Sequence, residues 1–275
     1  MPHNNDHLLS PKIMGVLNVT PDSFFDGGKY FNKDAAIARG HLMINEGVDY
    51  IDVGGESTRP GSDPVDENDQ INRVCPVISV LSSLDKKVVV SIDTRSAKVM
   101  ESAIEAGAKI VNDVSSLTKD TSSIEIIKKS NVAIVLMHSL DDPKLMQVNP
   151  KYDDVVSEVF SYLKERVDYC IQNGISQDRI IVDPGIGFGK TVIHNLKLLK
   201  NISVFHSLGC PVMLGTSRKS FIGKINGDKN VNDRLGGSLA TVIYGLKKGV
   251  KIFRVHDVIE TVQAIKIYQS IEGIE

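Results

Sequence analysis

The stretch "VVVSID", Val88–Asp93, decides the fold, because a nearly unbroken apolar run ends there in an acid. Short runs of this kind are typical of parallel strands that are buried on both faces. Other runs of the same character lie before and after it along the chain. The full set is Ile13–Val19, Tyr50–Gly54, Val88–Asp93, Ile110–Asp113, Ala133–Met137, Ile180–Asp183, Val212–Gly215 and Ile252–His256.

Segments with helical periodicity separate these runs. Asp34–Gly47 begins with an acid that can cap a helix and ends in glycine, and Asp153–Gly174 carries Val155, Val159 and Leu163 at near-helical spacing. Strand and helix alternate throughout, with no interdomain linker. The pattern predicts one (β/α)8 TIM barrel over 1–275, with 1–11 as a flexible tail, and 275 residues is close to the roughly 250 of such barrels. The remaining predicted helices are Ser96–Gly107, Asp233–Gly249 and Asp257–Glu272.

Composition excludes several classes of partner. The net charge of −2 at pH 7 gives no basic field that would attract nucleic acid, and no Lys/Arg run points to an anionic membrane surface. No apolar segment reaches transmembrane length. The three cysteines are isolated from one another in sequence, which is typical of free thiols in a reducing cytoplasm.

Two connecting segments are unusually long. They are Thr20–Phe31, "TPDSFFDGGKYF", after the first apolar run, and Gly55–Asp69, "GESTRPGSDPVDEND", after the second. Connections in such units are usually short, and long ones are commonly functional. Both contain glycine or proline, so we expect two flexible loops over the carboxyl ends of the strands.

Polar residues able to do chemistry stand at or just past the end of each run. In a barrel of this class the active site is built where the strands end. The pattern therefore predicts the location of the site as well as the fold. These residues are Asn18, Glu56, Asp93, Asn112, His138, Asp183, Lys219 and His256.

Two acids and an amide, Asp93, Asn112 and Asp183, should converge across the barrel mouth. A carboxylate accepts two parallel N–H bonds from an amino-imine edge, as it does from a guanidinium, so the three can hold a flat heterocycle. For any one of them alone, capping of the following helix or pairing with a lysine is an equal alternative. The three together favour a binding site.

A basic group lies late in the chain. Arg218 and Lys219 follow the seventh run, and Arg254 and His256 stand two apart on the eighth, hence on one face. Loops after strands seven and eight often hold phosphate in these barrels. Inward cations need an anion, and phosphate would serve. Lys219 could also form a Schiff base, but its polar neighbours in "GTSRKSFIG" favour a hydrogen-bond donor role.

The segment "DPGIGFGK", Asp183–Lys190, does not have the glycine spacing of a dinucleotide-binding loop. Its glycines more plausibly let the backbone approach a ligand, with Phe188 as an apolar wall. This motif is weak when taken alone.

Taken in order, "GVLNVTPDSFFDGG", "DVGGESTRPG", "SIDT", "NDV", "DPGIGFGKT", "GTSRKSFIG" and "RVHDV" resemble the dihydropteroate synthase family of folate biosynthesis. The resemblance covers nearly the whole chain. It implies a Mg²⁺-dependent transferase that joins 6-hydroxymethyl-7,8-dihydropterin pyrophosphate to p-aminobenzoate and releases pyrophosphate. It also implies a homodimer, and the apolar residues of the last predicted helix, Ile259, Ile267, Tyr268 and Ile271, hint at such a contact.

The resemblance also implies roles for individual residues. The residues implied to be catalytic are Asp26, Thr58, Arg59, Asp93 and Lys219. The pterin-binding residues are Asp93, Asn112, Met137, Asp183, Gly215 and Lys219. Pyrophosphate is assigned to Asn18, Thr58, Arg59, Arg254 and His256, with Asn18 also on Mg²⁺. The p-aminobenzoate slot is assigned to Phe24, Pro60, Phe188, Lys219 and Ser220.

One departure from the family pattern is Phe25, which stands where many members have a small polar residue. The segment "GFGKT" carries no insertion, so the resemblance implies that sulfonamides compete with p-aminobenzoate. Two other functions remain open. A pterin-binding methyltransferase shares the barrel and the pterin floor but has no need of the "ESTRPG" and "SRKS" loops. A non-catalytic pterin binder would be expected to have lost its loop acids or its basic group.

Overall fold

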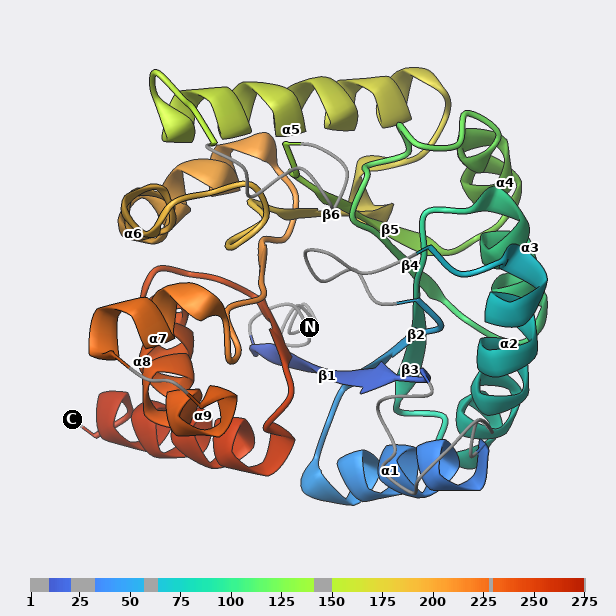
Figure 1. The fold of residues 1–275 in the computed structure, drawn as a ribbon, viewed down its shortest axis with the longest axis horizontal. Helices are drawn as coiled ribbons and strands as arrows, with labels where there is room; N and C mark the ends of the chain where they lie inside the picture. Colours follow the sequence, from blue (N-terminus) through green and yellow to red (C-terminus); the bar gives the residue numbers. More distant parts are fainter. Residues whose placement is uncertain (1–9, 21–32, 57–63, 141–149, 228–229, 275) are drawn as a thin grey trace, which may run out of the picture.

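A computed structural model describes residues 10–20, 33–56, 64–140, 150–227 and 230–274. Its eight strands are parallel and run in the order β6-β5-β4-β3-β2-β1-β8-β7 (Figure 1). A single bridge, Val182 to Val212, joins the two ends of this sheet, and the Val182 N–H donates to the Pro211 carbonyl at 3.0 Å. The sheet therefore comes close to closing on itself, which confirms the predicted (β/α)8 barrel.

The strands follow the predicted runs closely. They are β1 Lys12–Asn18, β2 Tyr50–Gly54, β3 Val89–Asp93, β4 Ile110–Asp113, β5 Ala133–Met137, β6 Ile180–Asp183, β7 Met213–Leu214 and β8 Ile252–Val255. The helices are α1 Lys33–Glu46, α2 Glu67–Leu84, α3 Ala97–Glu105, α4 Ser123–Lys129, α5 Val155–Gln172, α6 Val192–Lys200, α7 Ser220–Asn226, α8 Leu235–Lys247 and α9 Val258–Glu272. Short 3-10 helices are η3 Gln177–Arg179, η4 Ile202–Leu208 and η5 Val231–Arg234.

Two boundaries differ from the prediction. The second long loop was predicted to extend to Asp69, but α2 already begins at Glu67, and the Asp66 carboxylate caps it by accepting the Asn68 N–H at 2.9 Å. Acids in the first turn favour a helix N-terminus, and this effect outweighs the loop-like composition just before it. The helix predicted from Asp233 begins instead as a 3-10 turn and becomes α-helical at Leu235.

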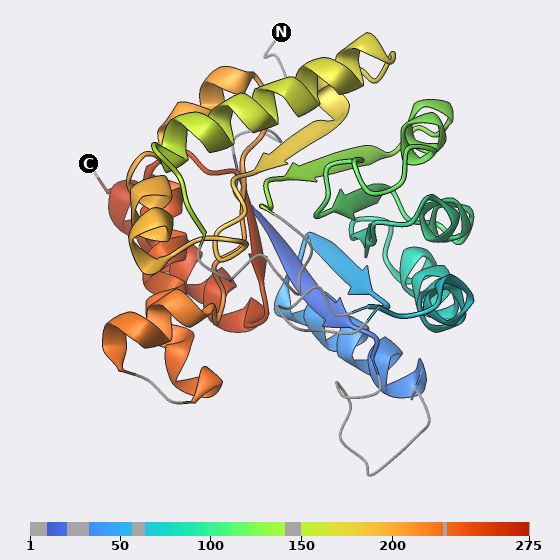
Figure 2. The ribbon, with the colours of Figure 1, turned by 45° about the horizontal axis from the view of Figure 1, so that its top comes forward.

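The helices form a ring outside the strands (Figures 1 and 2). The last helix, α9, packs against both α1 and α8, so the ring closes where the chain ends. Outward-facing strand residues such as Ile51, Ile92 and Val111 are fully buried between strands and helices. No helix of the described residues is long and apolar enough to cross a membrane.

The inside of the barrel changes character along its axis. An apolar cluster fills the end where the strands begin, and two residues further along the same face several strands become polar. Ile110 is thus followed by Asn112, Ile181 by Asp183, and Ile252 by Arg254. The polar groups are therefore carried on rigid strands above a packed floor. The cluster consists of Met14, Ile110, Val135, Ile181, Met213 and Ile252.

Candidate active site at the carboxyl ends of the strands

A network of charged hydrogen bonds crosses the polar end of the barrel. Arg254 on β8 donates from Nε to Asp52 Oδ2 at 2.7 Å and from Nη2 to Asp93 Oδ2 at 2.8 Å. The Asn112 Nδ2 on β4 donates to the same Asp52 oxygen at 2.9 Å. Four strands thus contribute to one cluster. The strand register places Asp93 directly opposite Asn112, two of the three residues that are predicted to converge.

Several oxygens of this network are buried and accept no hydrogen bond from the residues that the structure describes. Buried polar atoms are nearly always paired, so unpaired acceptors grouped in one place point to a ligand that brings N–H donors. The grouping agrees with the prediction of an amino-imine edge held by acids and an amide. These atoms are Asp52 Oδ1, Ser91 Oγ, Asp93 Oδ1 and Asn112 Oδ1.

The network balances burial against charge. Burial raises the pKa of Asp93 to about 7, although the Arg254 guanidinium opposes the shift and the Asp52 carboxylate adds to it. Burial also disfavours the charged form of Arg254, but the Asp52 and Asp93 carboxylates outweigh it and raise the pKa of Arg254. Arg254 therefore stays cationic, and Asp93 can change its protonation state near neutral pH.

A second cluster surrounds Asp183 and Lys219. Asp183 Oδ1 accepts the Gly185 N–H at 2.7 Å, and Lys219 Nζ lies 4.6 Å from the centroid of the Phe188 ring and donates to the Ile186 carbonyl. Burial lowers the pKa of Lys219 to about 8, and the Asp183 carboxylate opposes this shift. Burial raises the pKa of Asp183, and Lys219 opposes it in turn.

The surroundings of Lys219 correct one argument from the sequence. Its polar sequence neighbours were expected to crowd it, but the Arg218 guanidinium turns away and forms a paired contact with the Asp257 carboxylate. Ser217 is likewise engaged with His256, whose Nδ1 lies 3.1 Å from the Ser217 Oγ. Lys219 is therefore partly desolvated, and its observed contact with a carbonyl still agrees with the predicted donor role.

The basic residues that were predicted to form one group, Arg218, Arg254 and their neighbours, lie in two separate ion-pair networks. Arg218 is bound to Asp257, so it does not face the barrel mouth together with Arg254. The anions beside Arg254 are the Asp52 and Asp93 carboxylates, which corrects the expectation that the inward cations need a phosphate for balance. His256 follows β8, and its backbone N–H donates to Ser217 Oγ at 3.2 Å.

Other predicted site residues line the same opening. Met137 at the end of β5 is paired in register with Asp183. A Cβ on Gly215 would lie 3.7 Å from the Cβ of Arg254 and 3.9 Å from Asp183 Oδ2, so a side chain there would enter the pocket between them. Ser220 is exposed at the start of α7. Five predicted residues lie outside the described part of the chain: Phe24, Asp26, Thr58, Arg59 and Pro60.

Two of the strand-end polar residues, Glu56 and His138, contact other residues of the protein in a way that joins separate segments of the chain. Glu56 accepts from Arg95 Nη2 and from the Val65 N–H, both at 3.0 Å, so it joins the stem of the second long loop to the segment after β3. His138 is buried against Lys190, with 2.9 Å between its Nδ1 and the Lys190 Nζ.

Sequence reasoning missed Asp52, Ser217 and Lys190. Asp52 could have been found, because an acid on a buried strand two residues before Gly54 shares the inward face with the strand end. Ser217 and Lys190 gave no such signal, because their partners lie 39 and 52 residues away in the sequence.

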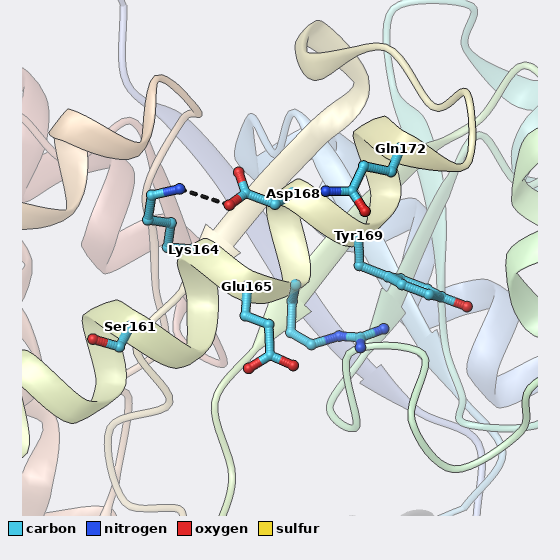
Figure 3. Close-up of a pocket in the computed structure, with 7 residues that line it drawn as sticks. Ser161, Lys164, Glu165, Asp168, Tyr169 and Gln172 are labelled. Carbon is cyan, nitrogen blue, oxygen red and sulfur yellow. Dashed lines mark hydrogen bonds and ion pairs between the residues drawn. The ribbon is translucent and has the colours of Figure 1, made fainter.

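A hollow on the outer surface of α5 lies away from this opening (Figure 3). Two of its charged residues pair with each other, Lys164 with Asp168 at 2.6 Å, whereas Arg166 stacks over the Tyr169 ring at 4.3 Å and donates to the Ser116 carbonyl. We therefore interpret it as a solvated helix face. The hollow is lined by Ser161, Lys164, Glu165, Arg166, Asp168, Tyr169 and Gln172.

The fold and the site together are those of a (β/α)8 barrel whose polar end groups unpaired acceptor oxygens beside the Arg254 guanidinium. Comparison with known proteins identifies the family to which the chain belongs. The pterin binding enzyme family matches residues 14–256. The dihydropteroate synthase of Escherichia coli is 41% identical over 263 residues, which cover 96% of this chain and 92% of that protein.

Solved structures agree with this match. The dihydropteroate synthase of Xanthomonas albilineans with 4-aminobenzoic acid superimposes with a TM-score of 0.92 at 39% identity, covering 98% of this chain and 95% of that one. The Yersinia pestis enzyme in a sulfonamide complex gives 0.91 at 38% identity, covering 97% and 96%. The chain belongs to the pterin-binding enzymes and, among them, to the dihydropteroate synthases.

Proposed function

We propose that the chain joins 6-hydroxymethyl-7,8-dihydropterin pyrophosphate to p-aminobenzoate, giving 7,8-dihydropteroate and pyrophosphate. This is the transferase activity of its family. The observation that carries the proposal is the group of unpaired acceptor oxygens on Asp93 and Asn112 beside the cation of Arg254, at the carboxyl ends of the strands. The related Xanthomonas structure contains 4-aminobenzoic acid.

The pterin ring is held by Asp93, Asn112 and Asp183, with Lys219 as a further donor. The buried carboxylates accept the amino and ring N–H groups in charge-assisted hydrogen bonds, which are the stronger class. Met137 is paired in register with Asp183, and Gly215 has no side chain beside Asp183 Oδ2, so in this proposal both lie next to the ring. When pyrophosphate departs, the pterin methylene becomes electron-poor, and the two nearby carboxylates stabilise the positive charge.

Pyrophosphate is held by Arg254 and His256, with the Ser217 hydroxyl beside the His256 ring. These groups neutralise the charge that develops on the leaving oxygen, so the C–O bond can break before the amine attacks. Because Arg254 also contacts Asp93 and Asp52, its guanidinium lies between the anion and the pterin floor. The reaction is dissociative, and the chain contributes positioning and electrostatics instead of covalent catalysis.

p-Aminobenzoate occupies a slot beside Phe188, Lys219 and Ser220. The Phe188 ring supplies an apolar wall, and Lys219 supplies a positive group next to it. A weak aryl amine can attack the electron-poor methylene without a strong general base. A sulfonamide with the same aryl amine would compete for this slot, and the related Yersinia structure is a sulfonamide complex.

Mg²⁺ is the proposed metal, and Asn18 is the residue that would hold it. The Asn18 side-chain oxygen lies at the mouth of the barrel beside Gly54, and an amide oxygen is a ligand type that Mg²⁺ accepts. Among the described residues no group of three His, Cys, Asp or Glu could hold a metal ion. A single amide oxygen from Asn18 fits an ion that takes one protein oxygen and otherwise water and phosphate oxygens. When bound, Mg²⁺ would neutralise charge on the departing pyrophosphate.

The two long loops complete the site in this proposal. Asp26 would stabilise the cationic pterin, and Thr58 and Arg59 would engage the leaving group. Phe24 and Pro60 would close the p-aminobenzoate slot. Water would capture the pterin cation, so excluding water gives these loops a chemical purpose.

The chain is proposed to act as a homodimer through the outer face of α9 and its neighbours. Ile259, Ile267 and Ile271 on α9 are 54%, 59% and 64% exposed, and Tyr244 on the adjacent α8 is 40% exposed. Large apolar side chains grouped on adjoining helices favour a contact. We expect Ile267→Asp to shift the sedimentation profile from dimer toward monomer, while a monomeric wild-type protein would contradict the proposal.

A cytoplasmic location is proposed from the thiols. Cys75, Cys170 and Cys210 are free, and two of them are buried. Burial raises the pKa of Cys170 to about 11, so this thiol stays protonated and unreactive in a reducing compartment.

The test of the proposed activity is product formation. The purified chain is incubated with dihydropterin pyrophosphate, radiolabelled p-aminobenzoate and Mg²⁺, and labelled dihydropteroate and released pyrophosphate are measured. Product that disappears with EDTA and returns with added Mg²⁺ supports the activity and the metal. Tight pterin binding without product would favour a non-catalytic pterin binder, and methyl transfer from methyltetrahydrofolate to a corrinoid would favour the methyltransferase.

A further inference from the structure

Lys190 is a buried lysine that the proposed reaction does not use. It is 3% exposed, and its Nζ lies 2.9 Å from His138 Nδ1, 2.9 Å from the Phe188 carbonyl and 3.3 Å from the His138 carbonyl. The Nζ therefore has three acceptors within hydrogen-bond distance, although burial lowers the pKa of Lys190 well below its usual value. Burial lowers the pKa of His138 to about 3, so its ring is neutral and Nδ1 can accept.

These contacts join two parts of the fold that are distant in sequence. His138 directly follows β5, whereas Phe188 belongs to the glycine loop after β6, which we define as Gly185–Lys190. At Gly185 a Cβ would lie 1.9 Å from the His138 carbonyl oxygen, so the loop passes directly against this backbone. Lys190 therefore fastens the glycine loop to the end of β5 at the point of closest approach.

Other anchors hold the remaining parts of the glycine loop. The Gly187 N–H donates to Asn195 Oδ1 at 2.7 Å, and the Tyr152 hydroxyl donates to the Gly189 carbonyl at 3.0 Å. Gly185, Gly187 and Gly189 have φ values of 69°, 86° and 64°, a backbone region that glycine adopts without strain. Lys190 is the anchor that binds the carbonyl of Phe188 itself.

The glycine loop in turn forms the surface on which Lys219 lies. Lys219 Nζ donates to the Ile186 carbonyl and faces the Phe188 ring, and a Cβ on Gly187 would lie 3.0 Å from the Lys219 Cδ. A shift of the loop would therefore move both the aromatic wall and the ammonium group. The Lys190 Nζ hydrogen-bonds the loop backbone at the Phe188 carbonyl, and its charge also acts on the Lys219 ammonium.

We propose that Lys190 is a positioning residue for the p-aminobenzoate half of the reaction, because its side-chain amino group fixes the glycine loop that places Phe188 and Lys219. This role rests on the proposed function, which puts both residues in the p-aminobenzoate slot. It does not require Lys190 to contact either substrate. Of the proposed pterin residues, Asp93 and Asn112 are carried by β3 and β4 and do not contact this loop. Asp183 and Lys219 do contact it, through the Gly185 N–H and the Ile186 carbonyl.

The test separates the two substrates. Lys190→Met keeps the length of the side chain and removes its donors. We expect the KM for p-aminobenzoate to rise and kcat to fall, each about tenfold, because small misplacements of positioning groups are costly. The Kd for dihydropterin pyrophosphate, measured by calorimetry at pH 8 without p-aminobenzoate, should change less than the KM for p-aminobenzoate, by about threefold at most against the tenfold that 1.4 kcal/mol represents, because Asp183 Oδ1 is held by the Gly185 N–H and not by Lys190. Lys200→Met on the exposed side of α6 is the matched control and should behave as wild type.

A second measurement distinguishes positioning from general damage. Lys190→Ala leaves a cavity that ethylammonium can enter, and saturable recovery of kcat by ethylammonium, absent with ethanol, supports the role. His138→Gln keeps an acceptor and should show a smaller effect in the same direction. A wild-type KM for p-aminobenzoate and kcat in Lys190→Met would overturn the proposal, as would an equal loss of pterin affinity in every folded variant. Failure of the proposed function is seen separately, as absence of dihydropteroate from the wild-type protein.

Discussion

The two ends of the barrel interior differ in what they contain and in what they do. Where the strands begin, Met14, Val135 and Met213 are almost fully buried and pack together without a polar partner. Where the strands end, Asp52, Asp93 and other buried groups leave oxygens unpaired. The same strands supply both ends, so a shift of two residues along one face separates stability from binding. Burial of unpaired acceptors costs free energy, and a ligand that satisfies them recovers it.

The largest expected effect on pterin affinity comes from a substitution of Asp183, at the polar end of the barrel. Asp183→Ala removes a buried carboxylate that we expect to accept pterin N–H groups, each worth about 1.5–3 kcal/mol as a charged hydrogen bond. Pterin affinity should fall by roughly 1,000-fold in calorimetry, on the order of 4 kcal/mol. The midpoint of urea unfolding should change little, because burial already disfavours the ionised form of Asp183. Retained pterin affinity would remove Asp183 from the site.

The opposite end gives the complementary prediction. Met14 is fully buried in the apolar floor, and Met14→Ala should lower the free energy of unfolding by about 3 kcal/mol, as is usual for large-to-small changes in a core. Urea unfolding followed by circular dichroism measures this loss. At low temperature, where the variant is folded, its pterin Kd should match that of wild type. A large change in Kd with unchanged stability would show that the two ends are not separate.

Asp52 tests the boundary between the two ends. Asp52→Asn keeps the shape but removes the charge that holds the Arg254 Nε, leaving Arg254 with Asp93 alone. We expect kcat/KM to fall on the order of 30-fold, about 2 kcal/mol, because Arg254 would be less well oriented toward pyrophosphate. Steady-state kinetics with varied dihydropterin pyrophosphate measures it. Unchanged kcat/KM would assign Asp52 a structural role only.

The smallest effect concerns pH. Because the pKa of Lys219 is lowered to about 8, its ammonium is charged below that pH and becomes neutral above it. Asp93, with a pKa near 7, gains a proton as the pH falls through that value. The kcat/KM profile should therefore be bell-shaped, declining up to tenfold per pH unit outside this range. Lys219→Arg should remove the alkaline decline, since arginine stays charged. An alkaline limb that persists in this variant would contradict the assignment to Lys219.

Most of the fold could be predicted because each strand is a local signal. The run Ile180–Asp183, for example, is apolar to its last residue and ends in an acid, and no distant information is needed to recognise it. Local composition did not predict the start of α2 at Glu67, because the surrounding residues have the composition of a loop. The inward direction of Arg254 was predictable from its spacing, but its two carboxylate partners were not, because strand order decides which side chains meet.

The site shows the same division. Asp93, Asn112 and Asp183 were identified because each stands at a strand end, a position with a known geometric meaning. The Lys190–His138 contact depends on how the glycine loop folds back over the end of β5. The positive φ values of its glycines permit this conformation, but the sequence alone does not predict it. Groups that act at the ends of elements can be predicted, whereas groups that hold loops in place need the structure.

The most direct test of the account is a crystal structure of the chain with dihydropterin pyrophosphate. We expect the pterin ring to lie between Asp183 and Asn112. Its N–H groups should lie about 2.7–3.2 Å from Asn112 Oδ1 and from a carboxylate oxygen of Asp93 or Asp183. We also expect the pyrophosphate to lie within hydrogen-bond distance of His256 or Arg254. A pterin bound elsewhere, with the Asp93 and Asn112 oxygens still unpaired, would contradict the claim that the polar end of the barrel is the active site.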